Sequence, residues 1–171
     1  MARTLVLIRH AKTERTHPGG DHERELVDRG GADALALGRW LADEELLPDL
    51  VLVSTAARAR QTTDHLLVGA GVDDAEVWAG RALYERGAQG VLEAVRETPE
   101  GVGTVWAVGH EPSISTLTLT LADETASAGT ALASVRDHVP TGTAAVLTLD
   151  GAWAELGQGM ARLAAVHTAR G

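Results

Sequence analysis

Three continuous apolar runs, each followed by polar or charged residues, constrain the fold of this chain more than any other feature. The runs are Thr4–Ile8, Leu50–Val53 and Thr104–Val108. They are far shorter than the roughly 20 apolar residues that a membrane-spanning helix needs. Runs of this length are typical of strands in a parallel sheet, because helices cover both faces of such a sheet. The runs therefore predict a buried central sheet.

Helical patterns fill the intervals between these runs. Apolar residues at helical spacing predict a helix from Asp28 to about Glu44, with Asp28 as its cap. Further helices are expected over residues 57–67, 88–97 and 113–121, and a short strand over residues 75–78. Because strands alternate with helices, the sequence predicts an α/β fold, a three-layer sandwich with a mostly parallel central sheet flanked by helices.

The C-terminal part of the chain is less regular. Residues 143–149 and 153–156 flank Asp150-Gly151, a pair typical of tight turns, so they predict a two-stranded hairpin. Residues 122–140 are small and polar and leave their structure open, while residues 160–168 fit either a strand or a helix. No linker or repeat interrupts the chain, and 171 residues suit a single domain over residues 1–171.

Composition narrows the possible partners. A formal net charge of -9 disfavours nucleic acid, because binding to nucleic acid depends on neutralising its phosphates. The chain has no cysteine, which excludes disulfides and thiolate metal sites. With no signal-like or membrane-spanning run, this favours a cytoplasmic protein with no membrane partner. A phosphate ligand would need a local positive pocket, which favours a small or exposed phosphoryl group.

Cationic and imidazole side chains follow all three buried runs. Arg9 and His10 follow the first, Arg58 comes shortly after the second, and His110 follows the third. Ligands of α/β sheets bind beyond the carboxyl ends of the strands, so these side chains can converge on one spot. Guanidinium groups fit phosphate oxygens, and histidine can attack phosphorus as a covalent nucleophile. The residues therefore predict a phosphoryl-transfer site.

Each of these signals has an ordinary alternative when it is taken alone. An Arg-His or Gly-His pair after a strand is usually a hydrogen-bonded feature of the rim, and a helical arginine is usually a solvated charge. The hypothesis depends on all three occurring in one short chain. Asp21, His17 and His22 could suggest a metal cluster, but their loop lacks the spacing of known metal motifs, so no metal or cofactor is expected.

At these positions the sequence resembles the histidine phosphatase superfamily, whose fold is phosphoglycerate mutase-like. Residues 7–12 are similar to its Arg-His signature, residues 54–62 to its second arginine motif, and residues 108–112 to its second histidine motif. Residues 21–30 resemble a segment of the short SixA-type phosphohistidine phosphatases. The four motifs occur in the family's order between residue 4 and about residue 115.

The resemblance implies roles for the matching residues. His10 would attack phosphorus and become transiently phosphorylated. Arg9, Arg58 and His110 would hold the phosphoryl oxygens and stabilise the transition state. Arg60 lies beyond the matching position and is expected at the surface.

Further residues carry weaker expectations. Lys12, Thr13 and Gly109 are candidates for substrate contacts, and Ser54 is expected to support the turn between strand and helix. Glu85 is the candidate general acid, since many superfamily members protonate the leaving group with a mid-chain carboxylic acid. An exposed charge on a helix is an equal alternative for Glu85.

Three functions remain open from the sequence. The first is a phosphatase of protein phosphohistidine, whose labile P–N bond and imidazole leaving group need no strong acid. The short chain favours it, because little room remains for a lid. The second is a phosphatase of a small phosphorylated metabolite, with Glu85 as the acid. The third is a phosphate-binding scaffold, against which the intact motif residues argue. A monomer or weak dimer is expected.

Overall fold

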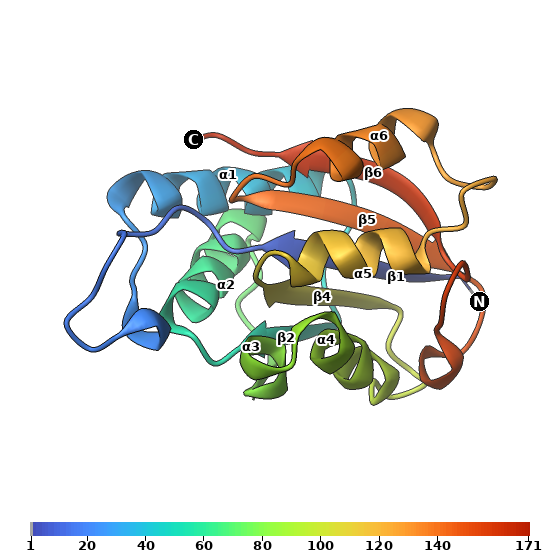
Figure 1. Cartoon of the computed structure of the whole chain (residues 1–171), viewed down its shortest axis with the longest axis horizontal. Coiled ribbons are helices and arrows are strands. Elements are labelled where there is room, and N and C mark those ends of the chain that lie inside the picture. The colour runs from blue at the N-terminus through green and yellow to red at the C-terminus, as the bar shows by residue number, and fades with distance from the viewer. Residues whose placement is uncertain (1) are drawn as a thin grey trace.

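The computed structural model describes residues 2–171 and has a six-stranded mixed sheet at its centre (Figure 1). The spatial order is β3-β2-β4-β1-β5-β6. Neighbouring strands among the first four are parallel, whereas β5 pairs antiparallel with both β1 and β6. The strands are β1 (Arg3–Arg9), β2 (Leu50–Ser54), β3 (Glu76–Gly80), β4 (Thr104–Gly109), β5 (Thr143–Leu149) and β6 (Arg162–Thr168).

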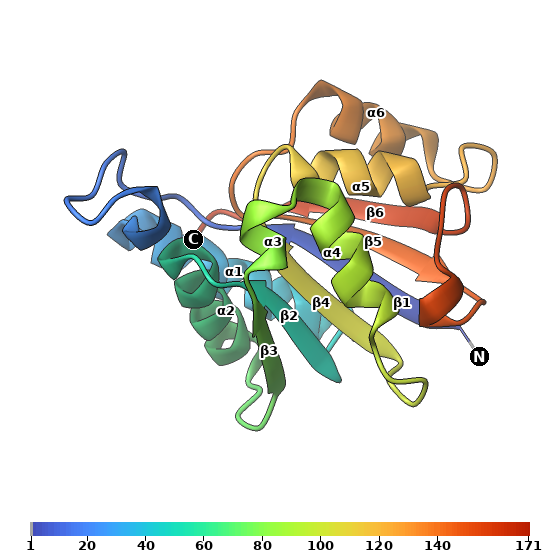
Figure 2. The same cartoon turned by 60° about the horizontal axis from the view of Figure 1, so that its bottom comes forward.

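Helices cover both faces of the sheet, which makes the molecule a three-layer sandwich (Figure 2). On one face lie α1 (Asp28–Asp43) and α2 (Ala57–Ala70), and on the other lie α3 (Ala82–Glu85), α4 (Gly87–Arg96), α5 (Ser113–Leu121) and α6 (Gly129–Asp137). Two single 3-10 turns complete the structure, η1 (Asp21–Glu23) and η2 (Trp153–Glu155).

Strand β1 shows why the predicted runs are apolar throughout. Its side chains alternate between the faces, so Leu5 and Leu7 pack into the core beneath α4 and α5, while Val6 and Ile8 pack beneath α1 and α2. All four side chains are fully buried. The predicted α/β sandwich is confirmed, with a mixed sheet that is parallel over its first four strands.

The predicted hairpin between residues 143–149 and 153–156 is wrong. Strand β5 pairs instead with β6, which has the same length and therefore offers a longer ladder of backbone partners. Residues 153–155 form η2, where Trp153 is fully buried and its indole nitrogen donates to the carbonyl of Val102 at 2.8 Å. The turn is therefore followed by a 3-10 turn with a buried Trp153 rather than by a second strand.

The regions that the sequence left open are now defined. Residues 122–140 contain α6, whose buried residues Ala131, Leu132 and Val135 pack into the core, and residues 160–168 contain β6. Asp28 is the first residue of α1 rather than its cap, because Val27 occupies the cap position without a side-chain hydrogen bond. Within residues 2–171, every helix is too short or too polar to cross a membrane.

Candidate active site

The carboxyl ends of β1 and β4 place His10 and His110 side by side. The two strands are neighbours in register, with Arg9 opposite Gly109, and the two imidazole rings lie 5.2 Å apart between centroids. Arg9, His10, Arg58 and His110 all line one cavity of ≈ 420 Å³ at this edge of the sheet. The structure therefore brings together the four side chains that the sequence singled out.

His10 is held in an orientation that suits a nucleophile. Its backbone amide donates to the carbonyl of Gly109 at 2.9 Å, and its Nδ1 lies 2.7 Å from the carbonyl oxygen of Ala11. A carbonyl only accepts, so Nδ1 carries the proton and Nε2 keeps its lone pair. Burial lowers the pKa of His10 to about 3, and the positive charges of Arg58 and Arg9 act in the same direction, against the hydrogen bond to Ala11. The imidazole is therefore neutral near pH 7.

The hydroxyl of Ser54 orients His110. Ser54 Oγ accepts a hydrogen bond from the amide of Ala56 at 3.2 Å and lies 2.7 Å from Nε2 of His110. The hydroxyl can thus donate to Nε2, which places the His110 proton on Nδ1. Burial lowers the pKa of His110 to about 4, and the charge of Arg58 contributes. Ser54 was expected only to support the turn after β2, and this contact adds a second role.

The two arginines bring charge into the cavity from different elements. Arg9 is the last residue of β1 and donates to the carbonyl of Val139 at 2.7 Å, while Arg58 lies in the first turn of α2 and is 6% exposed. Nε of each arginine and Nδ1 of His110 are buried without a partner among the described residues. Unpaired buried donors are costly, so this cluster fits an anionic ligand.

Thr62 joins the β1 loop to α2. Its Oγ1 accepts a hydrogen bond from the amide of Ala11 at 3.0 Å, and its hydroxyl donates to the carbonyl of Arg58 at 2.7 Å. This side chain therefore links the residue after His10 to the helix that carries Arg58. Arg60, two positions further along α2, is exposed, as expected.

The weaker candidates for substrate contacts divide into two groups. Lys12 and Thr13 line the cavity, so both can reach a ligand there. Gly109 is buried at the end of β4 and acts through its carbonyl, which holds the His10 amide.

Two residues that received no role from the sequence also line the cavity. Asp21 accepts hydrogen bonds from Arg58, and Arg24 donates to Asp21 at 3.0 Å and to the hydroxyl of Thr13 at 2.6 Å. Both belong to the segment of residues 21–30 that carried the SixA-type resemblance, so their spacing was the available signal.

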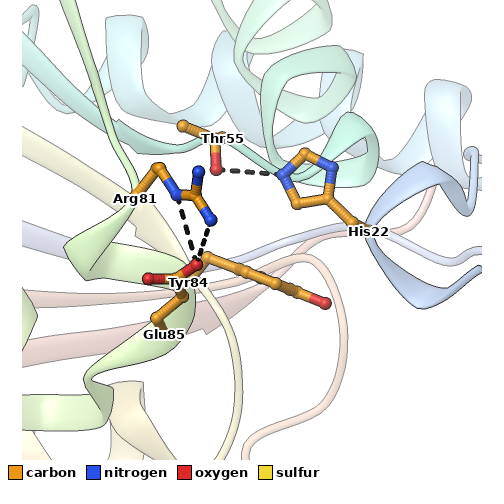
Figure 3. A pocket seen from close by; sticks show the side chains of 5 residues that line it. All are labelled: His22, Thr55, Arg81, Tyr84 and Glu85. Atoms are coloured by element: carbon orange, nitrogen blue, oxygen red, sulfur yellow. Dashed lines mark hydrogen bonds and ion pairs between the residues drawn. The ribbon is translucent and has the colours of Figure 1, made fainter.

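Glu85 lies outside this cavity, in a neighbouring recess of ≈ 420 Å³ lined by His22, Thr55, Arg81, Tyr84 and Glu85. Glu85 Oε1 accepts hydrogen bonds from Nε and NH2 of Arg81 at 3.2 and 2.6 Å. Figure 3 shows Glu85 turned towards Arg81, with the Tyr84 ring extending away from this pair. The centroids of the Tyr84 and His110 rings lie 5.6 Å apart, so the recess adjoins the cavity that holds His10 and His110.

The charges in the cavity give a local positive pocket in an acidic chain. Arg9, Lys12, Arg24 and Arg58 contribute positive charge, and Asp21 and Glu111 contribute negative charge. Glu111 is engaged structurally, because its Oε1 accepts the amide of Ser115 at 2.7 Å in the first turn of α5. The pocket is therefore suited to a small oxyanion.

The acidic and imidazole side chains of the loop after β1 are engaged with other groups of the chain. Asp21 is bonded to arginines, His22 lies 3.0 Å from the hydroxyl of Thr55, and His17 accepts the amide of Gly19. Across residues 2–171, no three His, Cys, Asp or Glu side chains are placed to share a metal ion.

Comparison with known proteins agrees with this geometry. A family model described as histidine phosphatase superfamily (branch 1) matches residues 5–80. The uncharacterized protein Rv1276c of Mycobacterium tuberculosis (strain ATCC 25618 / H37Rv) is 36% identical over 165 residues, which cover 95% of this chain and 100% of that protein. A 2,3-bisphosphoglycerate-dependent phosphoglycerate mutase of Bartonella tribocorum is 36% identical over 89 residues, covering 50% of this chain and 43% of the mutase.

A solved structure extends the likeness to the whole chain. SixA from Nakamurella multipartitia is 37% identical, with a TM-score of 0.87 over 99% of this chain and 97% of that one. Its match spans all of the strands and helices that build the cavity, including the C-terminal strands beyond the recognised motifs. The chain therefore belongs to the histidine phosphatase superfamily and is a phosphatase of its SixA type.

Proposed function

We propose that this protein is a metal-independent phosphohydrolase that forms a phosphohistidine intermediate on His10 and acts on phosphohistidine in proteins. The observation that carries the proposal is the pairing of a neutral, oriented His10 with a cavity whose two carboxylates are already engaged. The chemistry therefore favours a substrate that needs no strong acid.

The reaction proceeds by two displacements at phosphorus. Nε2 of His10 attacks the phosphoryl group, so that a new N–P bond forms as the P–N bond of the substrate breaks. The substrate imidazole can carry a proton from solvent on its other nitrogen near neutral pH, because its ordinary pKa is about 6.5, and it therefore leaves as neutral imidazole. Water then attacks phosphorus and gives one proton to solvent, the N–P bond to His10 breaks, orthophosphate leaves, and His10 returns to its neutral form with the proton still on Nδ1. Arg9, Arg58 and His110 stabilise charge on the phosphoryl oxygens in both steps.

The choice of phosphohistidine depends on where the carboxylates lie. Asp21 is kept ionised: burial raises its pKa, but hydrogen bonds from Arg24, Tyr84 and Arg58 outweigh that effect and hold the pKa well below the ordinary value. Glu85 lies in the neighbouring recess, ion-paired with Arg81. Neither is placed to protonate an alkoxide, whereas an imidazole leaving group does not require it.

The open recess and the relatives support a protein substrate. The recess beside His110 can receive the groups that flank a phosphorylated side chain. The SixA protein of Nakamurella multipartitia, described as a "putative phosphohistidine phosphatase", matches this chain over nearly its whole length. The local match to a phosphoglycerate mutase favours a second candidate, a phosphatase of a small metabolite that would draw Glu85 towards the leaving group.

Two substitutions distinguish a phosphohistidine phosphatase from a phosphatase of a small metabolite. Glu85→Gln removes a possible acid, and Glu93→Gln is the matched control, because Glu93 is also paired with an arginine, Arg86, but lies outside both cavities. We expect both variants to hydrolyse a phosphohistidine peptide within about twofold of the wild type, since general acid catalysis normally contributes about a hundredfold or more.

The kinetic comparison uses the phosphohistidine peptide and an alkyl phosphate, each with and without EDTA. Activity that survives EDTA and a strong preference for the peptide support the proposal. A loss of alkyl phosphatase activity specific to Glu85→Gln, together with a preference for that ester, supports the metabolite phosphatase instead. Binding of orthophosphate without turnover of either substrate supports the scaffold.

A further inference from the structure

The carboxylate of Asp21 accepts hydrogen bonds from three side chains in or beside the cavity that holds His10. Its Oδ2 accepts hydrogen bonds from NH2 of Arg58 at 3.1 Å and from the hydroxyl of Tyr84 at 2.8 Å, and its Oδ1 accepts NH1 of Arg24 at 3.0 Å. The backbone carbonyl of Asp21 also accepts NH1 of Arg58 at 2.7 Å. Both terminal nitrogens of Arg58 therefore donate to this one residue.

The carboxylate of Asp21 occupies donors that a phosphoryl group needs. Arg58 and His10 line the same cavity as Asp21, and a guanidinium recognises carboxylate and phosphate oxygens through the same planar pair of donors. A phosphoryl dianion on Arg58 would also face the negative charge of Asp21 at close range. The two anions thus compete for the NH2 donor of Arg58 and repel one another by charge.

The loop that carries Asp21 lies at the surface, so Asp21 can leave Arg58 without entering an apolar site. Asp21 begins η1, none of whose residues is buried, and the preceding Gly20 has φ 97°, a conformation that favours glycine. The Asp21 side chain is 53% exposed, so leaving Arg58 returns it to water rather than to an apolar site. Arg24 belongs to the same loop and can remain its partner after the exchange.

We propose that Asp21 is an internal competitor for the phosphoryl group at Arg58, holding the guanidinium until a phosphoryl group displaces it and taking it back when orthophosphate leaves. This inference rests on the proposed function, because it assigns Arg58 to the phosphoryl group. Asp21 would then set how tightly orthophosphate binds as a product, and would disfavour small, highly charged phosphates relative to a phosphoryl group carried on a protein.

The test is the affinity of the purified full chain for orthophosphate, measured by calorimetry and as inhibition of phosphohistidine hydrolysis. Asp21→Asn keeps the shape of the side chain and removes its charge. We expect it to bind orthophosphate about tenfold more tightly, the scale of one charge-assisted hydrogen bond. Asp64→Asn is the matched control, since Asp64 is exposed on the same helix as Arg58 and the net charge changes equally.

One further variant, Tyr84→Phe, and the control Asp64→Asn separate competition at Arg58 from a general effect of charge. Tyr84→Phe keeps the Asp21 charge but removes the hydroxyl that holds Oδ2, so we expect a smaller increase in phosphate affinity in the same direction. Orthophosphate affinity in Asp64→Asn should stay within about twofold of the wild type, because exposed charges interact weakly.

The outcomes distinguish this inference from the function on which it rests. If orthophosphate does not bind the wild type or does not compete with substrate, the proposed function itself fails. If orthophosphate competes in the wild type, but Asp21→Asn binds it equally or more weakly, Asp21 positions Arg58 and the competition is overturned. An equal gain in Asp64→Asn would also overturn it, because the effect would then be general.

Discussion

At the scale of single residues, the site depends on two imidazoles that burial keeps neutral. His10 and His110 have pKa values lowered to about 3 and about 4, chiefly because both rings lie away from water. The contacts with the Ala11 carbonyl and the Ser54 hydroxyl place the proton on Nδ1 of both rings. Nε2 of His10 keeps a free lone pair, whereas Nε2 of His110 accepts a hydrogen bond from Ser54. A nucleophile at phosphorus requires this neutral state.

This state predicts the titration of the two rings. We expect midpoints near pH 3 for His10 and near pH 4 for His110, so both imidazoles should stay neutral from pH 8 down to about pH 5. Histidine-selective NMR of the labelled protein measures the two midpoints, and the same chain in denaturant gives the reference near about 6.5. Midpoints near the reference value in the folded state would contradict the assigned burial and orientation.

The sequence predicted the positions of the motif residues, but it did not predict the contacts of Asp21. Arg9 directly follows an apolar run, His10 and His110 lie two positions after the ends of theirs, and Arg58 lies five positions after Val53. Local pattern therefore sufficed to place them at the sheet edge. The contacts of Asp21 arise because the loop after β1 folds back onto α2 and α3. Such contacts join positions 37 and 63 residues apart, which no local pattern encodes.

At the scale of elements, helix α1 packs closely against α2, the helix that carries Arg58. A Cβ added at Gly38 would lie 2.2 Å from the carbonyl of Leu66, and one added at Gly69 would lie 2.2 Å from the carbonyl of Leu35. Two small residues thus let the helix backbones meet. One turn of α1 is equally close to the β1 loop, because a Cβ at Gly30 would lie 2.1 Å from the Lys12 carbonyl.

This packing predicts a large difference between two glycine substitutions. Gly38→Ala should lower the free energy of unfolding by about 1–3 kcal/mol, because forced overpacking outweighs the better helix propensity of alanine. Gly129→Ala is the matched control at the start of α6, where an added Cβ meets nothing within 4 Å. Urea unfolding followed by circular dichroism measures both. Equal stability of the two variants would mean that α1 and α2 can separate freely.

The elements that the sequence missed share a physical cause. The strands β1, β2 and β4 are apolar on both faces, so their pattern is strong. Residues 153–156 look similar locally, yet they end as η2 because Trp153 has a buried place against Val102 and β6 offers β5 a longer partner. Helix α6 buries only one narrow face among small residues, which leaves little periodic signal.

At the scale of the whole molecule, the topology of the sheet assembles the site. Strands β1 and β4 are about a hundred residues apart in the chain and adjacent in the sheet, and β2 pairs with β4 on its other side. Their three carboxyl ends deliver two imidazoles and two guanidinium groups to one cavity. The chain carries a net charge of -9, so this positive cavity is a local exception that favours small anions over polyanions.

The central claim is that His10 receives the phosphoryl group, and the phosphoenzyme tests it most directly. The wild type is incubated briefly with a phosphohistidine donor, quenched in base and mapped by mass spectrometry, beside His10→Ala and the control His138→Ala. We predict an acid-labile, base-stable phosphate on His10 in the wild type and in His138→Ala, and none in His10→Ala. Labelling retained in His10→Ala, or an acid-stable phosphate on another residue, would contradict the account.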